Sequence, residues 1–216
     1  MTYAAVLFDK DGTLLDDVPY NVDPALMRFA PGAEDALAIL AAHGFRLFVV
    51  SNQSGVALGR FPLGALAEME AHLRRMFDAC GVTLEAAYWC PHHPAGVSAR
   101  YACPCECRKP APGLLLRAAH EHGIDLAASW FVGDILDDVE AGTRAGCRTV
   151  LIDNGNETQW EAGPFRMPTL REPDLLRAAL AIIREHDSAA SPRGPAAQAP
   201  HTGGEPRSEA VHGSTG

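Results

Sequence analysis

The sequence feature that most constrains the fold is an alternation of short apolar runs with segments of helical periodicity. The runs lack polar alternation, which is typical of strands buried on both faces of a parallel sheet. Five such runs predict strands at residues 4–8, 47–50, 86–89, 129–132 and 148–152. Five segments with apolar residues at helical spacing predict helices at residues 35–43, 63–80, 114–122, 138–145 and 175–186. This alternation predicts an α/β fold with a doubly wound, mainly parallel sheet and helices on both faces.

The length and composition fit one domain followed by a tail. The chain has 216 residues, and single cores usually contain about 100–200. Between Asp187 and Gly216, 19 of 30 residues are Pro, Gly, Ser or Ala. Such a segment buries too little apolar area to offset its chain entropy. We therefore expect a globular domain at residues 1–186 and a disordered tail at residues 187–216.

The charge and the apolar runs exclude two classes of partner. The chain has 27 acidic and 18 basic residues, a net charge of −9, whereas nucleic-acid binding is driven by a basic excess. No apolar run reaches the roughly 18–20 residues that a membrane span needs. The first apolar stretch is also too short for a secretory signal. We therefore expect a cytoplasmic protein that binds neither nucleic acid nor membrane, and a monomer.

Polar clusters follow several of the predicted strands. In doubly wound folds, ligands bind beyond the carboxyl ends of the strands. The first strand is followed by residues 9–13, the second by residues 51–55 and the fourth by residues 133–138. A fourth cluster, Arg108-Lys109-Pro110, precedes a helix and holds one of only two lysines in the chain. We expect these four clusters to meet at one rim of the sheet.

The residue types at this rim indicate phosphate chemistry. The carboxylates of Asp9, Asp11 and Asp134 would repel one another unless a hard cation neutralised them, and Mg²⁺ prefers such oxygen ligands. A phosphate bound there would meet the Ser51 hydroxyl and the Lys109 ammonium. A carboxylate oxygen could then attack the phosphorus in line.

The four clusters resemble the motifs of the haloacid dehalogenase-like hydrolases. Those motifs are Asp-x-Asp-Gly-Thr, a Ser or Thr at the end of the second strand, a Lys, and Gly-Asp-x-x-x-Asp. Their counterparts here are residues 9–13, Ser51, Lys109 and the cluster that begins at Gly133. The resemblance extends from residue 4 to about residue 155, with the motifs in the same order and at similar spacing.

This resemblance implies a role for each carboxylate. Asp9 would be the nucleophile that forms an aspartyl-phosphate. Asp11 would protonate the leaving alcohol and later deprotonate the attacking water. Asp9, the backbone carbonyl of Asp11 and Asp134 would hold Mg²⁺. The motif does not decide whether Asp137 or Asp138 supports this metal site.

A second group of residues predicts a zinc site. Cys90 and His92 are separated by one residue, as are Cys105 and Cys107. Three sulfurs and one imidazole match a closed, structural Cys₃His zinc site, which would organise the loop from Cys90 to Cys107. Cys103 also forms a Cys-x-Cys pair with Cys105, so it remains an alternative ligand. Buried free cysteines without a metal are the other interpretation.

The sequence around these cysteines resembles one branch of the superfamily. Residues 8–13, 51–55, 90–94 and 107–110 are similar to the D-glycero-D-manno-heptose 1,7-bisphosphate phosphatases and histidinol-phosphatases. The resemblance implies a compact domain without a separate cap and a phosphomonoesterase in carbohydrate metabolism. The expected substrate is the heptose bisphosphate, from which the 7-phosphate would be removed. Histidinol phosphate or another small sugar phosphate is the alternative.

Four residues are expected to bind the phosphorylated substrate, and one position departs from the branch. Many heptose members carry a basic residue directly after the fourth-motif Asp, whereas this chain has Ile135. An arginine such as Arg108 or Arg100 could supply the missing contact. The expected substrate-binding residues are Ser51, Asn52, Arg108 and Lys109.

A zinc-stabilised binding module is the alternative from a different class of protein. It would use the cysteine-rich loop to hold a protein or nucleic acid. The acidic net charge disfavours nucleic acid. The pair of Asp9 and Asp11 beside a lysine disfavours a pure binder, which has no need of it.

Overall fold

The computed structural model describes residues 2–190 and contains a six-stranded sheet in the order β3-β2-β1-β4-β5-β6. All neighbouring strands pair in parallel. The strands are β1 (Ala5–Phe8), β2 (Arg46–Asn52), β3 (Leu84–Cys90), β4 (Trp130–Gly133), β5 (Arg148–Ile152) and β6 (Leu170–Glu172). The helices are α1 (Ala33–Ala42), α2 (Ala65–Ala79), α3 (Gly113–His122), α4 (Leu136–Ala145) and α5 (Leu175–Ala190), with short 3-10 turns at Pro24–Leu26 and Leu126–Ala128.

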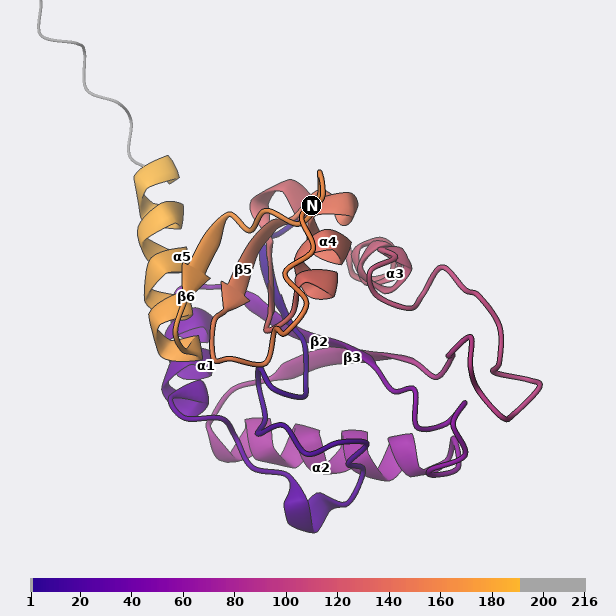
Figure 1. Ribbon diagram of the computed structural model, residues 1–216. Helices are drawn as coiled ribbons and strands as arrows, with labels where there is room; N and C mark the ends of the chain where they lie inside the picture. Colours follow the sequence, from indigo (N-terminus) through magenta and orange to yellow (C-terminus); the bar gives the residue numbers. More distant parts are fainter. Residues whose placement is uncertain (1, 191–216) are drawn as a thin grey trace, which may run out of the picture.

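Helices cover both faces of the sheet, in three layers (Figure 1). Successive strand residues point to opposite faces. In β1, Val6 and Phe8 therefore enter the core formed with α1, α2 and α5. Ala5 and Leu7 enter the second core, with α3 and α4. Because the four central strands β2, β1, β4 and β5 are buried on both faces, their sequences are mainly apolar, and the predicted fold class is confirmed.

The structure differs from the expected elements at the C-terminal end. Strand β6 has only three residues, partly exposed, and lacks an apolar run that would have predicted it. Helix α5 continues to Ala190, so residues 187–190 are helical rather than part of the expected tail. Alanine is the best helix former, and the Ser188 hydroxyl donates to the Arg184 carbonyl. The rest of that expected tail, residues 191–216, lies outside the described residues.

The strand order places one crevice at the centre of the sheet. The chain moves outward from β1 through β2 to β3, then returns to pair β4 with the other edge of β1. Such a reversal of strand order is where doubly wound folds bind ligands. Asp9 and Asp134 follow these two adjacent strands directly. The sheet topology therefore brings the first and fourth motifs together.

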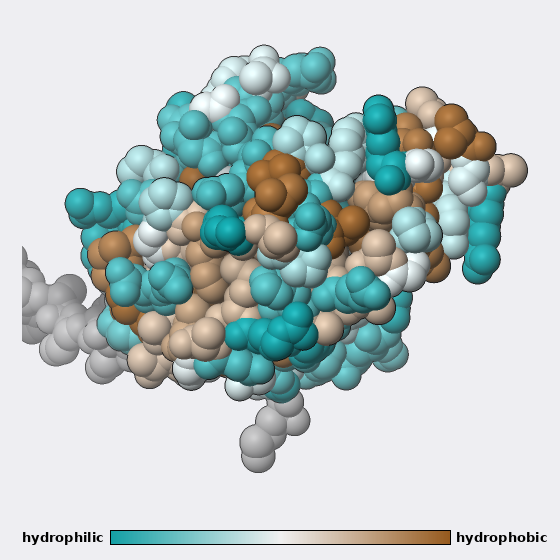
Figure 2. Space-filling view, turned by 90° about the horizontal axis from the view of Figure 1, so that it is seen from below, coloured by the Kyte–Doolittle hydropathy of each residue, from teal (hydrophilic) through white to brown (hydrophobic). Residues whose placement is uncertain are grey.

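The surface of the described part carries both hydrophobic and hydrophilic residues. On the face seen from below, the strongly hydrophobic residues stand in groups separated by hydrophilic ones (Figure 2). Within residues 2–190, no helix has both the length and the apolar character needed to cross a bilayer.

Candidate active site

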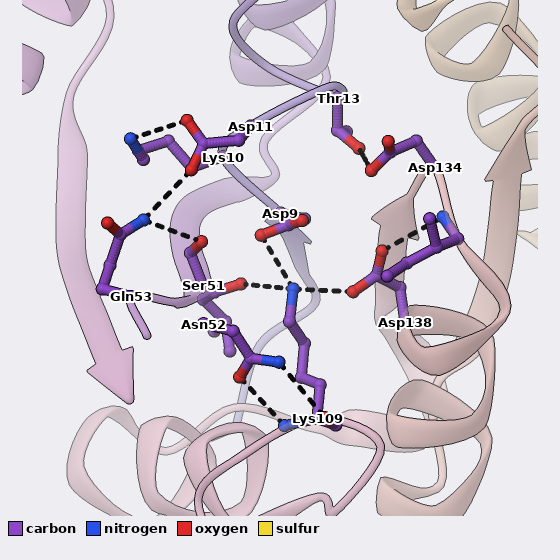
Figure 3. A network of polar contacts seen from close by, with 12 residues as sticks. Asp9, Lys10, Asp11, Thr13, Ser51, Asn52, Gln53, Lys109, Asp134 and Asp138 are labelled. Atoms are coloured by element: carbon purple, nitrogen blue, oxygen red, sulfur yellow. Dashed lines mark hydrogen bonds and ion pairs between the residues drawn. The ribbon is translucent and has the colours of Figure 1, made fainter. Parts of the chain in front are cut away.

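A buried lysine joins two carboxylates at the centre of the rim (Figure 3). The Lys109 ammonium lies 2.7 Å from Asp9 Oδ1 and 2.6 Å from Asp138 Oδ1. It also donates to the Val50 carbonyl at 3.3 Å. Lys109 is only 2% exposed, so its charge is balanced by these carboxylates rather than by water.

The backbone on both sides of this ion pair is fixed by hydrogen bonds. The Asp9 amide donates to the Val132 carbonyl at 2.9 Å, which holds Asp9 against β4. The Asn52 side chain donates to the Lys109 carbonyl at 3.1 Å and accepts from the Lys109 amide at 3.0 Å. Both polar atoms of Asn52 thus hold the Lys109 backbone. The expectation that Asn52 contacts the substrate stays a prediction.

The structure distinguishes the two aspartates that the fourth motif left open. Asp138 is 1% exposed and faces Lys109, and its Oδ2 accepts from the Ile135 amide at 3.3 Å. Asp137 instead pairs with Arg166 at 2.6 Å, away from the site. Successive helix residues point about 100° apart, so only one of the two can face the rim. That residue is Asp138.

Asp134 is held beside the first motif. The Thr13 hydroxyl donates to Asp134 Oδ1 at 3.0 Å, and the Asn156 amide donates to Asp134 Oδ2 at 2.8 Å. Gly12 packs against this carboxylate with a φ of +78°, and a Cβ there would lie 2.2 Å from Asp134 Oδ2. Glycine at this position of the first motif is therefore a steric requirement as well as a conformational one.

Burial and mutual repulsion raise the pKa values of these acids. Burial, together with the charge of Asp9, raises the pKa of Asp134 to about 6. Burial also raises the pKa of Asp138 to about 8, although Lys109 opposes this. The pKa of Lys109 is also raised, because the charges of Asp138 and Asp9 outweigh the effect of its burial. A further cation would therefore be needed to keep all of these acids ionised at neutral pH.

The donor set of this cluster fits a divalent cation. Asp9, Asp134 and Asp138 each offer a carboxylate oxygen, and these oxygens lie within 4.8 Å of one another. With all three carboxylates ionised, one ammonium leaves two negative charges, which one Mg²⁺ would balance. All three residues are buried, so carboxylate oxygens would replace part of the hydration shell of the ion, as Mg²⁺ sites in proteins allow.

Asp11 is held apart from this cluster by its own partners. The Lys10 ammonium lies 2.7 Å from Asp11 Oδ1, and the Gln53 amide donates to Asp11 Oδ2 at 3.1 Å. Lys10 is fully buried and also donates to the Asn21 carbonyl at 3.1 Å. Burial raises the pKa of Asp11, while Lys10 lowers it. The Asp11 side chain is 25% exposed, which leaves it accessible to a ligand.

A cavity of about 280 Å³ opens in front of Asp11. Gln53, one of its lining residues, donates from its side-chain amide to the Ser51 hydroxyl at 3.3 Å. The Arg108 guanidinium donates to the Ser54 hydroxyl, also in the cavity wall. The polar lining residues are Asp11, Asp17, Tyr20, Asn52, Gln53 and Ser54. A polar ligand in this cavity could therefore contact Asp11 and Asn52, one of the four expected substrate-binding residues.

The expected zinc ligands also come together. Cys90, His92, Cys105 and Cys107 place their donor atoms within 4.8 Å of one another. Cys107 Sγ lies 3.2 Å from Cys90 Sγ, Cys105 Sγ and His92 Nδ1, and Cys90 Sγ lies 3.7 Å from Cys105 Sγ. A tetrahedron with Zn–S bonds of about 2.3 Å has edges of roughly 3.8 Å. The cluster therefore fits a closed zinc site, and Cys103 does not belong to it.

Comparisons with known proteins point to one family. A family model described as HAD-hydrolase-like matches residues 106–180. A D-glycero-beta-D-manno-heptose-1,7-bisphosphate 7-phosphatase from Yersinia pestis is 40% identical over 152 residues, which cover 70% of this chain and 81% of the relative. The protein of the same name from Pseudomonas aeruginosa is 32% identical over 187 residues, which cover 85% of this chain and all of the relative.

A solved structure agrees with these relatives. A D,D-heptose 1,7-bisphosphate phosphatase from B. bronchiseptica, complexed with magnesium and phosphate, superposes with a TM-score of 0.73 at 30% identity. The match covers 85% of this chain and 99% of that one. The uncapped α/β fold and the four motifs at its rim define a HAD-like hydrolase. Within that class, the chain belongs to the family of D-glycero-D-manno-heptose-1,7-bisphosphate 7-phosphatases.

Sequence analysis missed several residues that complete the site. Lys10 and Gln53 lie inside the motifs, but their bonds to Asp11 depend on the folded loops. Asn154 and Asn156 lie in the loop that follows β5, and the Asn154 side chain donates to the Gly12 carbonyl at 2.7 Å. The rule that ligand-binding residues follow strand ends applies to β5 as well, so this signal was present in the sequence.

Proposed function

We propose that this chain is a Mg²⁺-dependent phosphomonoesterase that removes the 7-phosphate of D-glycero-beta-D-manno-heptose 1,7-bisphosphate. The observation that carries the proposal is the ion pair of Lys109 with Asp9 and Asp138, beside the polar cavity at Asp11. The reaction and the anomer are those in the names of the Yersinia and Pseudomonas relatives.

The first half of the proposed reaction transfers the phosphoryl group to Asp9. A carboxylate oxygen of Asp9 attacks the phosphorus, and the bond between the phosphorus and the sugar oxygen breaks. Asp11 donates its proton to the departing sugar oxygen. The raised pKa of Asp11 favours the protonated form needed for this step. Lys109 fixes one oxygen of Asp9, which limits the orientations from which the attack can begin.

The second half returns Asp9 to its starting state. Asp11, now a carboxylate, takes a proton from a water molecule. The water oxygen attacks the phosphorus, and the bond between the phosphorus and the Asp9 oxygen breaks. Inorganic phosphate leaves, and Asp11 is protonated again, so the acid and base roles balance over one cycle.

Asp9, Asp134 and the backbone carbonyl of Asp11 would hold Mg²⁺ in this proposal. When bound, the ion neutralises charge on the phosphoryl group. Lys109 and Ser51 would bind the same group, and Arg108, whose guanidinium donates to the Ser54 hydroxyl, would contact a more distant part of the substrate. Asp138 would act through Lys109, whose ammonium it holds at 2.6 Å.

Zinc would have a structural role in this proposal. The four ligands Cys90, His92, Cys105 and Cys107 would close the coordination sphere, so no position remains for a catalytic water. The last of them lies two residues before Lys109. A cytoplasmic location and a monomeric state remain predictions.

The test is an assay of phosphate release with and without Mg²⁺. The substrates are the heptose bisphosphate, histidinol phosphate and an aryl phosphate. Asp9→Asn should abolish turnover because the amide is not a nucleophile, whereas the exposed Asp16→Asn should retain it. In the wild type, beryllium fluoride with Mg²⁺ should give a fluorine NMR signal of an Asp9 adduct that Asp9→Asn lacks.

Each alternative gives a different result in the same assay. Faster release from histidinol phosphate would overturn the substrate assignment but leave the chemistry intact. Substantial turnover by Asp9→Asn would overturn the covalent route. No turnover of any substrate, in a folded protein with Mg²⁺, would favour a zinc-stabilised binding module.

A further inference from the structure

The loop between β5 and β6 reaches into the cation site through one amide. Asn156 Nδ2 donates to Asp134 Oδ2 at 2.8 Å, from a position 22 residues further along the chain. Thr13 occupies the other oxygen, Oδ1, at 3.0 Å (Figure 3). Both oxygens of Asp134 are thus bonded by neutral donors from different parts of the chain, which fixes the plane of the carboxylate.

The space around this contact is closely filled. A Cβ added to Gly12 would lie 2.2 Å from Asp134 Oδ2 and 2.5 Å from Asn156 Nδ2. The backbone of the first motif therefore packs directly against the hydrogen bond. Asp134 is only 5% exposed, so water has little room to replace a lost donor.

Neighbouring residues of the same loop hold Asn156 in place. Asn154 Nδ2 donates to the Gly12 carbonyl at 2.7 Å, and Asn154 Oδ1 accepts from the backbone N–H of Asn156 at 3.1 Å. Glu157 Oε2 accepts from the Leu136 amide at the start of α4 at 2.6 Å. These contacts join the loop to the elements that carry the first and fourth motifs. The Asn156 side chain is therefore positioned before any ligand arrives.

We propose that Asn156 is a positioning residue for Asp134 and sets the affinity of the site for a divalent cation. This inference rests on the proposed function, in which Asp134 holds Mg²⁺. A buried carboxylate that lacks a donor on one oxygen can rotate away from the orientation in which it binds a cation. The Asn156 side-chain amide limits this rotation and holds the Asp134 carboxylate in one orientation. Hydrogen-bond partners of metal ligands typically contribute about 10–100-fold in affinity.

The test measures Mg²⁺ binding directly, by isothermal titration calorimetry of the full chain with MgCl₂ alone. Asn156→Leu keeps a similar shape but cannot donate, and Asn156→Ala removes the side chain. Both should weaken Mg²⁺ binding about 10-fold or more. Gln159→Ala is the matched control, because it removes an exposed amide of the same loop that makes no side-chain contact with Asp134. It should bind Mg²⁺ as the wild type does.

A kinetic measurement separates positioning from a general structural effect. The Mg²⁺ concentration that gives half-maximal activity should rise in Asn156→Leu by the same factor. At saturating Mg²⁺, KM for the phosphate ester should stay at the wild-type value. A loss of kcat that saturating Mg²⁺ does not restore would overturn the inference.

The remaining outcomes separate this inference from the proposed function. Wild-type Mg²⁺ affinity in either folded Asn156 variant would overturn the role of Asn156 and leave the phosphatase intact. Equal weakening in Gln159→Ala would assign the effect to the loop as a whole and would also overturn it. Absence of Mg²⁺ binding by the wild type would overturn the proposed function itself. Circular dichroism establishes which variants are folded.

Discussion

Replacing Lys109 with methionine tests the electrostatic structure of the site. The Lys109 ammonium lies 2.7 Å from Asp9 Oδ1 and 2.6 Å from Asp138 Oδ1, and its side chain is 2% exposed. Methionine has a similar length and no charge, so the two carboxylates would remain buried without their cation. Removing one partner of a buried ion pair usually costs about 3–5 kcal/mol. We expect a loss of this size in Mg²⁺-free buffer above about pH 8, where Asp138 is ionised in the wild type.

The loss should depend on pH in a defined direction. Burial raises the pKa of Asp138 to about 8 in the wild type, against the effect of Lys109. In Lys109→Met the opposing ammonium is gone, so this pKa rises further and the native state keeps the proton to higher pH. Stability then falls as the pH rises, by up to about 1.4 kcal/mol per pH unit for each such group. The difference between wild type and Lys109→Met should therefore be larger at about pH 9.5, above the wild-type pKa of Asp138, than at about pH 6, where both native states bind this proton.

Urea unfolding followed by circular dichroism measures these free energies, in Mg²⁺-free buffer at equal zinc content. Arg117→Met is the control because the Arg117–Glu121 pair is exposed, and such pairs contribute only about 0.3–0.5 kcal/mol. Adding Asp138→Asn to Lys109→Met should recover part of the lost stability. A loss below about 1 kcal/mol, or one that does not change with pH, would refute the reasoning.

Three further predictions concern the metals and the fourth motif. Cys107→Ser should lower the zinc content and the Tm, whereas Cys103→Ser should retain both; metal analysis and calorimetry measure this. Gly133→Ala should abolish phosphatase activity, because its Cβ would lie 2.2 Å from Asp138 Cβ; wild-type kcat would contradict the close packing. Raising the pH from about 5 to about 8 should destabilise the Mg²⁺-free protein, because the pKa of Asp134 rises to about 6 on folding. Mg²⁺ should therefore raise the Tm more at the higher pH, and an equal shift at both would contradict this.

The fold could be predicted because its strands are buried on both faces. A continuous apolar run such as Val6-Leu7-Phe8 is compatible with little except a central strand between two helical layers. Strand β6 lies at the edge of the sheet, and its residues alternate between half-buried and exposed. Three residues carry too little periodicity to distinguish a strand from a loop, so β6 was not predicted.

The site could be predicted only to the level of its motifs. Asp9 and Asp134 follow adjacent strands, so the topology alone brings them together. The choice between Asp137 and Asp138 depends on where α4 begins, and helix boundaries are the least certain part of a prediction from sequence. The partner of Asn52 could not be predicted either, because its amide meets a backbone segment 57 residues away.

The position of Lys109 joins the cluster of Cys90, His92, Cys105 and Cys107 to the proposed phosphate site in one structural unit. From the side of β2, the Asn52 amide holds the Lys109 backbone through two hydrogen bonds. On the other side, Cys107 lies two residues before Lys109. Arg108, between them, donates from its guanidinium to the His92 carbonyl at 3.5 Å. A lysine with four rotatable side-chain bonds keeps its ammonium in place only if its backbone is held. Zinc would therefore influence catalysis without touching the substrate, by fixing the segment from which this single ammonium reaches Asp9.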